Sequence, residues 1–185
     1  MTNRWLLHNS FSIDISDAYD NRAVESMVAE KLDEAQAVDE TVLNPRLREA
    51  KINLILSNAK DVGMRIANQG HNNFVDTILS GSKGDYFNLG QVKGLLGQQI
   101  INGSRIPKMV DNGTRTLIHF PRGRLSFRDE CESRGFVMSS FYKGVSPREF
   151  FFHSMSGRQG VCDTAMTTFM SGYTMRKLVN LMADV

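Results

Sequence analysis

A helix start close to the C-terminus constrains the fold of this sequence more than any other feature. Ser146 is a favourable N-cap residue, Pro147 suits the first helical position, and Glu149 completes a capping box. No proline follows before Val185. One helix over 146–185 would be about 60 Å long, since each residue adds roughly 1.5 Å. No domain of this size needs such a strut, so we expect the helix to span a gap in a larger assembly.

Glycines interrupt the predicted helix at Gly157, Gly160 and Gly172. Each interior glycine costs on the order of 1 kcal/mol relative to alanine. Three of them favour either the close approach of a partner or a helix that bends. For Gly157 and Gly160, simple helix–helix crossings are an equally good interpretation.

Gly172 lies beside aromatic and basic residues. Tyr173, Arg176 and Lys177 are three to four residues apart, so they share one face of the helix, and Thr168 and Gly172 lead into that face. Cations of this kind contact phosphates, and a tyrosine ring stacks on a base. A surface tyrosine with basic neighbours is also common, so the cluster alone does not establish nucleic-acid binding.

Helix-forming residues fill the segment 16–68. Asn44-Pro45 breaks it, because proline disfavours helix in the residue before it. Apolar residues recur at helical spacing on either side of this break, which predicts an antiparallel helical hairpin. The first apolar stripe contains Val24, Met27, Val28, Leu32, Ala35 and Val38, with Lys31 as its one polar member, and the second contains Leu47, Leu54, Ile55, Ala59, Val62 and Ile66.

The middle segment, 81–144, is rich in glycine and irregular in pattern. Such spacing favours short helices and loops in which the backbone closely approaches other groups. Short strands are predicted around 115–120 and 135–138. The closely spaced glycines are Gly81, Gly84, Gly90, Gly94, Gly97 and Gly103.

Composition excludes several classes of protein. The chain has 22 basic and 20 acidic residues, and this near balance means that nucleic-acid binding would need a local patch. Cys131 and Cys162 have no CxxC partner, so reduced thiols of an intracellular protein are expected. No apolar run reaches the length of a membrane span, and the N-terminal residues do not resemble a signal peptide.

No metal site or phosphate loop is predicted. The segment Gly81-Ser82-Lys83-Gly84 lacks P-loop spacing, and taken alone it is a solvated turn. The histidines and cysteines are scattered without ligand spacing. Asp14, Asp17 and Asp20 lie where a helix begins, and acidic residues there interact favourably with the helix dipole.

Several segments together resemble the largest subunit of multisubunit RNA polymerases. The resemblance is dense over 81–184 and looser before it, where Phe11-Ser12-Ile13 and Asp17 are similar to the entry to that family's funnel helices. The region between the funnel and the bridge helix is matched by Ser82-Lys83-Gly84, Asn88, Gln91, Gly97-Gln98-Gln99, Gly103, Arg105-Ile106, His119-Phe120, Gly135-Phe136-Val137 and Ser140-Phe141. The bridge helix is matched by Glu149-Phe150-Phe151-Phe152-His153-Ser154-Met155, Gly157-Arg158, Asp163-Thr164-Ala165, Gly172-Tyr173 and Arg176.

The resemblance implies roles for particular residues. Thr168 and Phe169 would face the template base, Tyr173 the downstream template, and Arg176 and Lys177 its backbone. Residues that would line the pore, near the trigger loop, are Gln91, Gln98, Gln99 and His153. The Gln98-Gln99 pair and the three consecutive phenylalanines resemble the eukaryotic, archaeal or large-DNA-virus branch of the family.

Four positions depart from the family pattern. The family usually has a small residue at Phe169, a basic residue at Thr167, glycine at Ser156 and serine at Asp85. A bulky residue at position 169 implies either a shifted helix or a divergent, viral enzyme.

The resemblance implies a mainly α fold in three parts. These are a funnel-like helical hairpin over 1–80, an irregular glycine-rich middle with short helices and strands over 81–145, and a long bridge helix over 146–185. The implied partners are the rest of the largest subunit, the second-largest subunit, template DNA, nascent RNA and the incoming nucleotide, with no membrane. The implied location is intracellular: the nucleus, or the host cytoplasm or virion if the chain is viral.

The family's magnesium-binding aspartate motif and its trigger loop do not occur in this sequence. Two-metal nucleotidyl transfer needs those carboxylates. We therefore expect no cofactor bound by this chain, Mg²⁺ in the complete enzyme, and no polymerisation by the chain alone. The competing interpretation is a non-catalytic helical adaptor or interaction protein that derives from this subunit.

Overall fold

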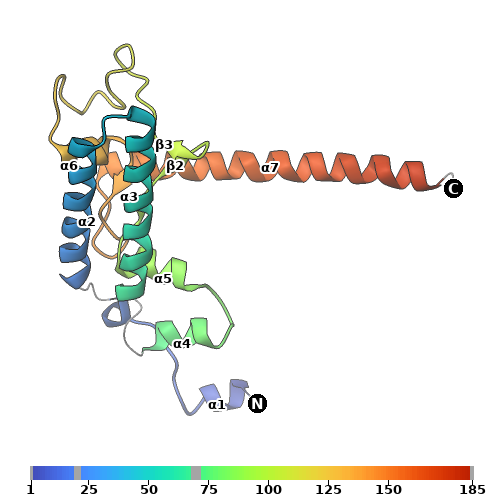
Figure 1. Ribbon diagram of the computed structural model, residues 1–185. Helices are drawn as coiled ribbons and strands as arrows, with labels where there is room; N and C mark the ends of the chain where they lie inside the picture. Colours follow the sequence, from blue (N-terminus) through green and yellow to red (C-terminus); the bar gives the residue numbers. More distant parts are fainter. Residues whose placement is uncertain (1, 19–21, 68–71, 184–185) are drawn as a thin grey trace.

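The computed structural model describes residues 2–18, 22–67 and 72–183. The predicted mainly helical fold is confirmed (Figure 1). In chain order the helices are α1 (Thr2–Leu6), the 3-10 helix η1 (Ile15–Ala18), α2 (Arg22–Thr41), α3 (Pro45–Ala67), α4 (Asn73–Leu79), α5 (Tyr86–Lys93), α6 (Phe127–Ser133) and α7 (Pro147–Ala183). The strands are β1 (Gly97–Gln98), β2 (Ile100–Ile101), β3 (Ser104–Arg105) and β4 (Phe136–Val137).

Helices α2 and α3 form the predicted antiparallel hairpin, the two upright helices of Figure 1. The turn between them ends at Asn44, whose side-chain oxygen accepts hydrogen bonds from the backbone N–H groups of Arg46 (3.1 Å) and Leu47 (3.4 Å). The predicted apolar stripe of α2 is confirmed, because its members lie in the core and Val38 packs against them. Its buried members are Val24, Met27, Val28, Leu32 and Ala35.

The apolar stripe predicted for the second helix of the hairpin is wrong in part. Leu47 and Leu54 are 49% and 62% exposed, whereas Ala59 is fully buried and Ile55 is partly buried. Residues 47 and 54 are nearly two full turns apart, on a line about 100° from position 55, so the stripe combined two faces. The core face of α3 is instead Ile52, Leu56 and Ala59. The side chains of Val62 and Ile66 lie outside the described part of the structure.

The middle segment folds around two short antiparallel pairings, β1 with β4 and β2 with β3. The strand predicted around 135–138 is confirmed as β4. The strand predicted around 115–120 is wrong: Arg115 forms an isolated bridge with Val110, and the residues that follow form bends and turns. Gly135 has a φ of 89°, and a Cβ there would lie 2.6 Å from Ile106 Cδ1, so both conformation and space require glycine.

The long C-terminal helix is confirmed as α7, which runs unbroken from Pro147 to Ala183; Asp184 and Val185 lie outside the described residues. Figure 1 shows α7 as a nearly straight helix. Every residue over 160–183 is exposed, and we call this segment the arm and the described residues before it the body. Within the described residues, no helix is long and apolar enough to cross a membrane.

Candidate nucleic-acid interface

The body fixes the first turn of α7 through the predicted capping box. Ser146 Oγ accepts from Glu149 N–H (3.3 Å), and the Glu149 carboxylate accepts from Ser146 N–H (2.9 Å). The same carboxylate accepts from Ser139 Oγ (3.0 Å) and from Met138 N–H (3.2 Å). Burial opposes ionisation of Glu149, but these hydrogen bonds outweigh it and lower its pKa. A charged Glu149 therefore ties the helix start to the chain that follows β4.

Phe152 anchors the next turn of α7 in an aromatic cluster. Its ring is 1% exposed and stacks on Phe120, with centroids 6.3 Å apart. Arg148 covers the other ring of this pair, with its guanidinium carbon 4.9 Å from the Phe120 centroid. Ile106 completes the buried set. The capping box and this cluster together set the direction in which the arm leaves the body.

Four of the six predicted nucleic-acid-binding residues meet on one face of the arm. The rings of Phe169 and Tyr173 stack with centroids 6.3 Å apart and planes 3° apart. Lys177 Nζ lies 4.3 Å from the Tyr173 centroid, and the Arg176 guanidinium carbon lies 5.5 Å from it. Cations at these distances interact favourably with the ring face. The result is an exposed two-ring strip with two positive charges at its outer end.

Thr168 and Gly172 lie on a neighbouring face of the arm. Successive helical residues are about 100° apart, so Thr168 does not share a face with Phe169. The Thr168 hydroxyl donates to the carbonyl of Thr164 (2.9 Å). A Cβ at Gly172 would meet nothing within 4 Å, so the space beside this glycine is open.

Three of the four predicted pore residues meet where α7 crosses the middle segment. Gln99 Oε1 lies 3.2 Å from His153 Nδ1, which joins the two predicted residues directly. Gln98 is buried, and its amide nitrogen donates to the carbonyls of Gln99 (2.9 Å) and Arg134 (2.8 Å). Gln98 and Gln99 therefore hold the backbone around the junction, and Gln99 also contacts α7.

Gln91, the fourth predicted pore residue, lies on α5 and reaches this junction through its backbone. Its carbonyl accepts from Phe141 N–H (3.1 Å), and the Phe141 ring packs edge-on against His153, with centroids 5.6 Å apart. The structure thus connects Gln91 to His153 through one intervening aromatic residue.

Sequence reasoning missed Lys60, which reaches the same junction from α3. Its Nζ lies 4.0 Å from the centroid of Phe87, and its stem packs against Gly97. A Cβ at Gly97 would lie 2.9 Å from Lys60 Cβ, and the φ of Gly97 is 76°, so this glycine accommodates the lysine. Desolvation lowers the pKa of His153, and the nearby Lys60 charge lowers it further. In the sequence, nothing distinguishes Lys60, which follows Ala59, from a lysine on a solvent-exposed helix face.

Sequence reasoning also missed Glu49, which joins α3 to the middle segment. Its carboxylate accepts from Arg105 Nε (2.8 Å) and Nη2 (2.7 Å), and from Arg134 Nη2 (3.0 Å). Hydrogen bonds from Arg105 lower the Glu49 pKa, although burial opposes the shift. Arg134 in turn donates to the Ile106 carbonyl (2.6 Å), so this ion cluster supports the segment that carries Gln98 and Gln99.

Two departures from the family pattern have structural roles. Asp85 caps α5 by accepting from Asn88 N–H (3.0 Å), a function that serine performs equally well. The Ser156 hydroxyl donates to the Ile100 carbonyl (3.2 Å), a hydrogen bond that glycine cannot make.

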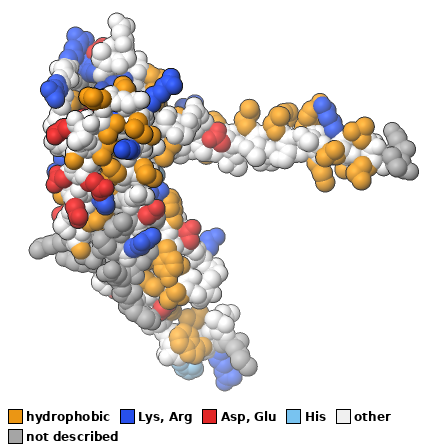
Figure 2. Space-filling model, viewed as in Figure 1, with side chains coloured by type: hydrophobic (Ala, Val, Ile, Leu, Met, Phe, Trp, Pro, Cys, Tyr) orange, Lys and Arg blue, Asp and Glu red, His pale blue; other side chains and the backbone are white. Residues whose placement is uncertain are grey.

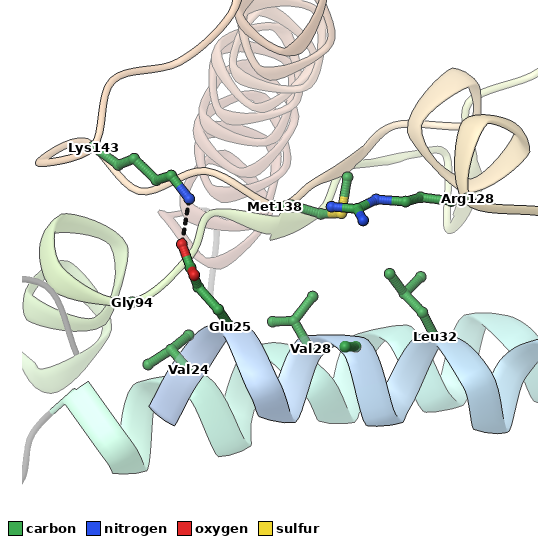
Figure 3. A pocket seen from close by; sticks show the side chains of 9 residues that line it. Val24, Glu25, Val28, Leu32, Gly94, Arg128, Met138 and Lys143 are labelled. Atoms are coloured by element: carbon green, nitrogen blue, oxygen red, sulfur yellow. Dashed lines mark hydrogen bonds and ion pairs between the residues drawn. The ribbon is translucent and has the colours of Figure 1, made fainter. Parts of the chain in front are cut away.

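A cavity of about 340 Å³ lies apart from both candidate regions, between α2, the end of α5 and the segment 138–143 (Figure 3). Val28 and Leu32 extend from α2 toward the side of the cavity where Met138 lies, and an ion pair of Glu25 with Lys143 (2.5 Å) lies beside them. None of the predicted site residues lines it.

Among the described residues, no group of three or more His, Cys, Asp or Glu side chains could hold a metal ion. They therefore do not fit the magnesium site that two-metal nucleotidyl transfer requires. Cys131 and Cys162 are both free, and burial raises the pKa of Cys131 to about 12.

Comparison with known proteins decides the family. Residues 19–137 match the family described as RNA polymerase Rpb1, domain 4, and residues 144–185 match RNA polymerase Rpb1, domain 5. The chain belongs to the family of the largest RNA polymerase subunit. The chain is 47% identical, over its whole length, to the "Probable DNA-directed RNA polymerase II subunit RPB1 homolog" of Invertebrate iridescent virus 6.

The chain is also similar to archaeal proteins. The "DNA-directed RNA polymerase subunit Rpo1N" of Methanothermobacter thermautotrophicus is 39% identical over 91% of the chain. The Rpo1N of Halococcus morrhuae is 36% identical over 98% of it. The chain spans 20% of the iridescent virus protein, 18% of the first archaeal protein and 56% of the second.

Proposed function

We propose that the arm positions template DNA and takes part in translocation within an assembled DNA-directed RNA polymerase. The observation that carries this proposal is the stacked pair of Phe169 and Tyr173 with Arg176 and Lys177 at its outer end. Arginine and lysine contact backbone phosphates, and aromatic rings stack on bases without regard to sequence. The open space at Gly172 allows a strand to approach the helix backbone.

The junction on the body serves the nucleotide-entry pore in this proposal. Gln98, Gln99 and His153 meet there, and Gln91 lies one residue away through Phe141. The proposed partners are the rest of the largest subunit, the second-largest subunit, template DNA, nascent RNA and the incoming nucleotide. The proposed location is intracellular: the nucleus, or the host cytoplasm or virion.

The isolated chain should not polymerise. Its sequence lacks the metal-binding aspartate motif, and the complete enzyme supplies Mg²⁺ in this proposal. Pure chain incubated with primed template, nucleotides and magnesium should extend nothing. Template-dependent extension would contradict this part of the proposal.

The template role is tested on the reconstituted polymerase. Tyr173→Ala removes a stacking platform that contributes about 1–3 kcal/mol per base, so elongation should slow at all salt concentrations. Arg176→Ala should weaken template contact mainly at low salt, because phosphate neutralisation is salt-dependent. Thr174→Ala is the matched control, since Thr174 is an exposed arm residue about 100° around the helix from Tyr173.

Subunit assembly is measured alongside elongation. If both variants assemble normally and elongate at the parental rate across the salt range, the four residues only pack against neighbouring subunits. Co-purification distinguishes the polymerase function, which predicts polymerase subunits as partners, from the adaptor alternative, which predicts other partners. We retain the division into 1–80, 81–145 and 146–185 as a proposal about how the segment is organised.

A further inference from the structure

The loop over 108–124 differs in charge from the rest of the chain. It contains four basic residues, Lys108, Arg115, Arg122 and Arg124, and one acidic residue, Asp111, so its charge is +3, whereas the charge of the whole chain is +2. In Figure 1 the loop projects past the upper end of the α2–α3 hairpin. The net positive charge of the chain therefore resides in this loop.

The loop is held in one conformation by its own polar contacts. Arg115 pairs with Asp111, and its guanidinium donates to the carbonyls of Ile118 (3.2 Å) and Phe120 (3.0 Å). Arg122 Nε donates to the same Asp111 carboxylate (3.2 Å). A loop that is fixed in advance loses less conformational entropy when a partner binds to it.

These contacts leave positive charge at the surface. Arg115 and Arg122 share one carboxylate, and the Arg122 side chain is 82% exposed. Arg124 is also exposed, and among the described residues no carboxylate lies within ion-pair distance of it. A guanidinium in this situation is suited to the carboxylate of another molecule. The hollow next to Arg122 has a volume of about 560 Å³ and is lined by Asp111, Asn112, Thr114, Arg115, Arg122 and Gly123.

Apolar side chains of the same loop favour a protein over a nucleic acid as its partner. Met109 is 75% exposed and Ile118 is 68% exposed, so neither serves the core. Phe120, the loop's phenylalanine, is buried against Phe152 and cannot stack on a base. Backbone phosphates offer methionine and isoleucine no surface for packing, whereas protein interfaces are enriched in arginine and methionine.

We propose that the loop over 108–124 binds a protein segment in which an Asp or Glu lies beside an apolar side chain. The carboxylate enters the hollow and accepts hydrogen bonds from Arg122, and Arg124 supplies a second positive charge. The apolar side chain packs on Met109 and Ile118. The site lies in the body and binds protein, so the proposal does not depend on the template role of the arm.

Photo-crosslinking in the reconstituted polymerase tests the site. The probe is introduced as Ile118→p-benzoylphenylalanine, and it should form adducts with one protein segment that contains an apolar residue next to Asp or Glu. Leu79→p-benzoylphenylalanine is the matched control, because Leu79 is 63% exposed and lies on α4 at the opposite end of the body (Figure 1). The control probe should not label that segment.

Charge variants are then made in the chain that carries the probe at position 118. Arg124→Glu should lower the adduct yield roughly tenfold, because like charges repel across an interface, and Arg124→Lys should keep most of the yield. Lys83→Glu makes the same charge change at an exposed position outside the loop and should leave the yield unchanged. Replacing the carboxylate of the labelled segment by lysine should restore the yield in Arg124→Glu.

Other results would overturn the proposal. Adducts that nuclease digests would make the loop a nucleic-acid contact. Adducts with a segment that has no acidic residue, or a parental yield in Arg124→Glu, would show that charge does not select the partner. The absence of any adduct would leave the loop as a solvated turn.

Discussion

The body and the arm differ in the burial of their apolar side chains, although α7 belongs to both. In the body, apolar side chains of α2 and α3 face each other and the buried cation Arg105 has an acidic partner. In the arm, large apolar residues face solvent: Val161 is 71% exposed, Phe169 68% and Met182 75%. Figure 2 shows hydrophobic side chains along the upper edge of the arm and on both edges near its outer end. The chain's own folding explains the buried apolar residues of α2 and α3 but not the exposed apolar residues of the arm.

A free helix of this kind gains little stability from its own residues. Most helical stability in proteins comes from packing of an amphipathic face, and interior glycines oppose helix formation by about 1 kcal/mol each. The arm has Gly160 and Gly172 and no packed face within the described residues. Its apolar and aromatic residues are therefore suited to surfaces that other chains or nucleic acid provide.

The largest expected effect comes from breaking the arm itself. Gly172→Pro removes a helical hydrogen bond and introduces a clash, at a cost of about 3 kcal/mol. Elongation by the reconstituted polymerase should fall to a small fraction of the parental rate, while the thermal unfolding of the body in the isolated chain stays unchanged. Both are measured on the same variant.

Gly172→Ala is the control for that variant. A Cβ at this position meets nothing within 4 Å of the chain, and alanine favours helix. Its effect on the isolated chain should be a slightly more stable arm. A lower unfolding temperature of the body in Gly172→Pro would show that arm and body are not independent.

Elements with local signals were predictable from the sequence. The start of α7 depended on Ser146, Pro147 and Glu149, which act within one turn, and the structure has that capping box. The second stripe of the hairpin failed because leucines at 47 and 54 are exposed in the chain alone. Leu47 and Leu54 lie about 100° around the helix from Ile55, so the predicted stripe combined an exposed face with the core face.

The site residues also fall into two groups: those that a local sequence pattern predicts and those that only the folded chain brings together. Tyr173, Arg176 and Lys177 are neighbours on one helix, so their spacing sufficed to group them. The contact of Gln99 with His153 joins residues 54 positions apart, and only family resemblance pointed to both. Glu49 and Lys60 act through partners that the fold brings to them from distant positions. No local pattern records such contacts.

A smaller effect is expected from breaking the ion cluster of the body. Glu49→Gln leaves the buried Arg105 without a carboxylate, and unfolding free energy should fall by about 2 kcal/mol. Glu34→Gln, which removes the exposed partner of Lys31, should cost much less, because solvent screens an exposed ion pair. Denaturant unfolding of the chain measures both. Equal losses in the two variants would contradict a special role for the cluster.

The pH dependence of Glu49→Gln has a definite sign. The pKa of Glu49 is lowered in the folded state, so its contribution is present above its ordinary value and is lost as pH falls through the folded value. The stability difference between parent and variant should therefore be constant near neutral pH and shrink in acid. A difference that grows as pH falls would exclude this explanation.

The smallest effect locates the boundary between body and arm. The Ser156 hydroxyl bonds to the Ile100 carbonyl in β2, whereas the Thr164 hydroxyl bonds to the Gly160 carbonyl within α7 (2.8 Å). Each change to alanine removes one hydroxyl hydrogen bond and improves helix propensity by a few tenths of a kcal/mol. In Thr164→Ala the lost bond lies within the helix and competes with its backbone pattern, so the body should not be destabilised.

In Ser156→Ala the lost bond joins two elements, and the body should lose about 0.5 kcal/mol after the propensity gain. Hydrogen exchange of the β2 and α7 amides measures the difference, and equal protection in the two variants would place the boundary before Ser156.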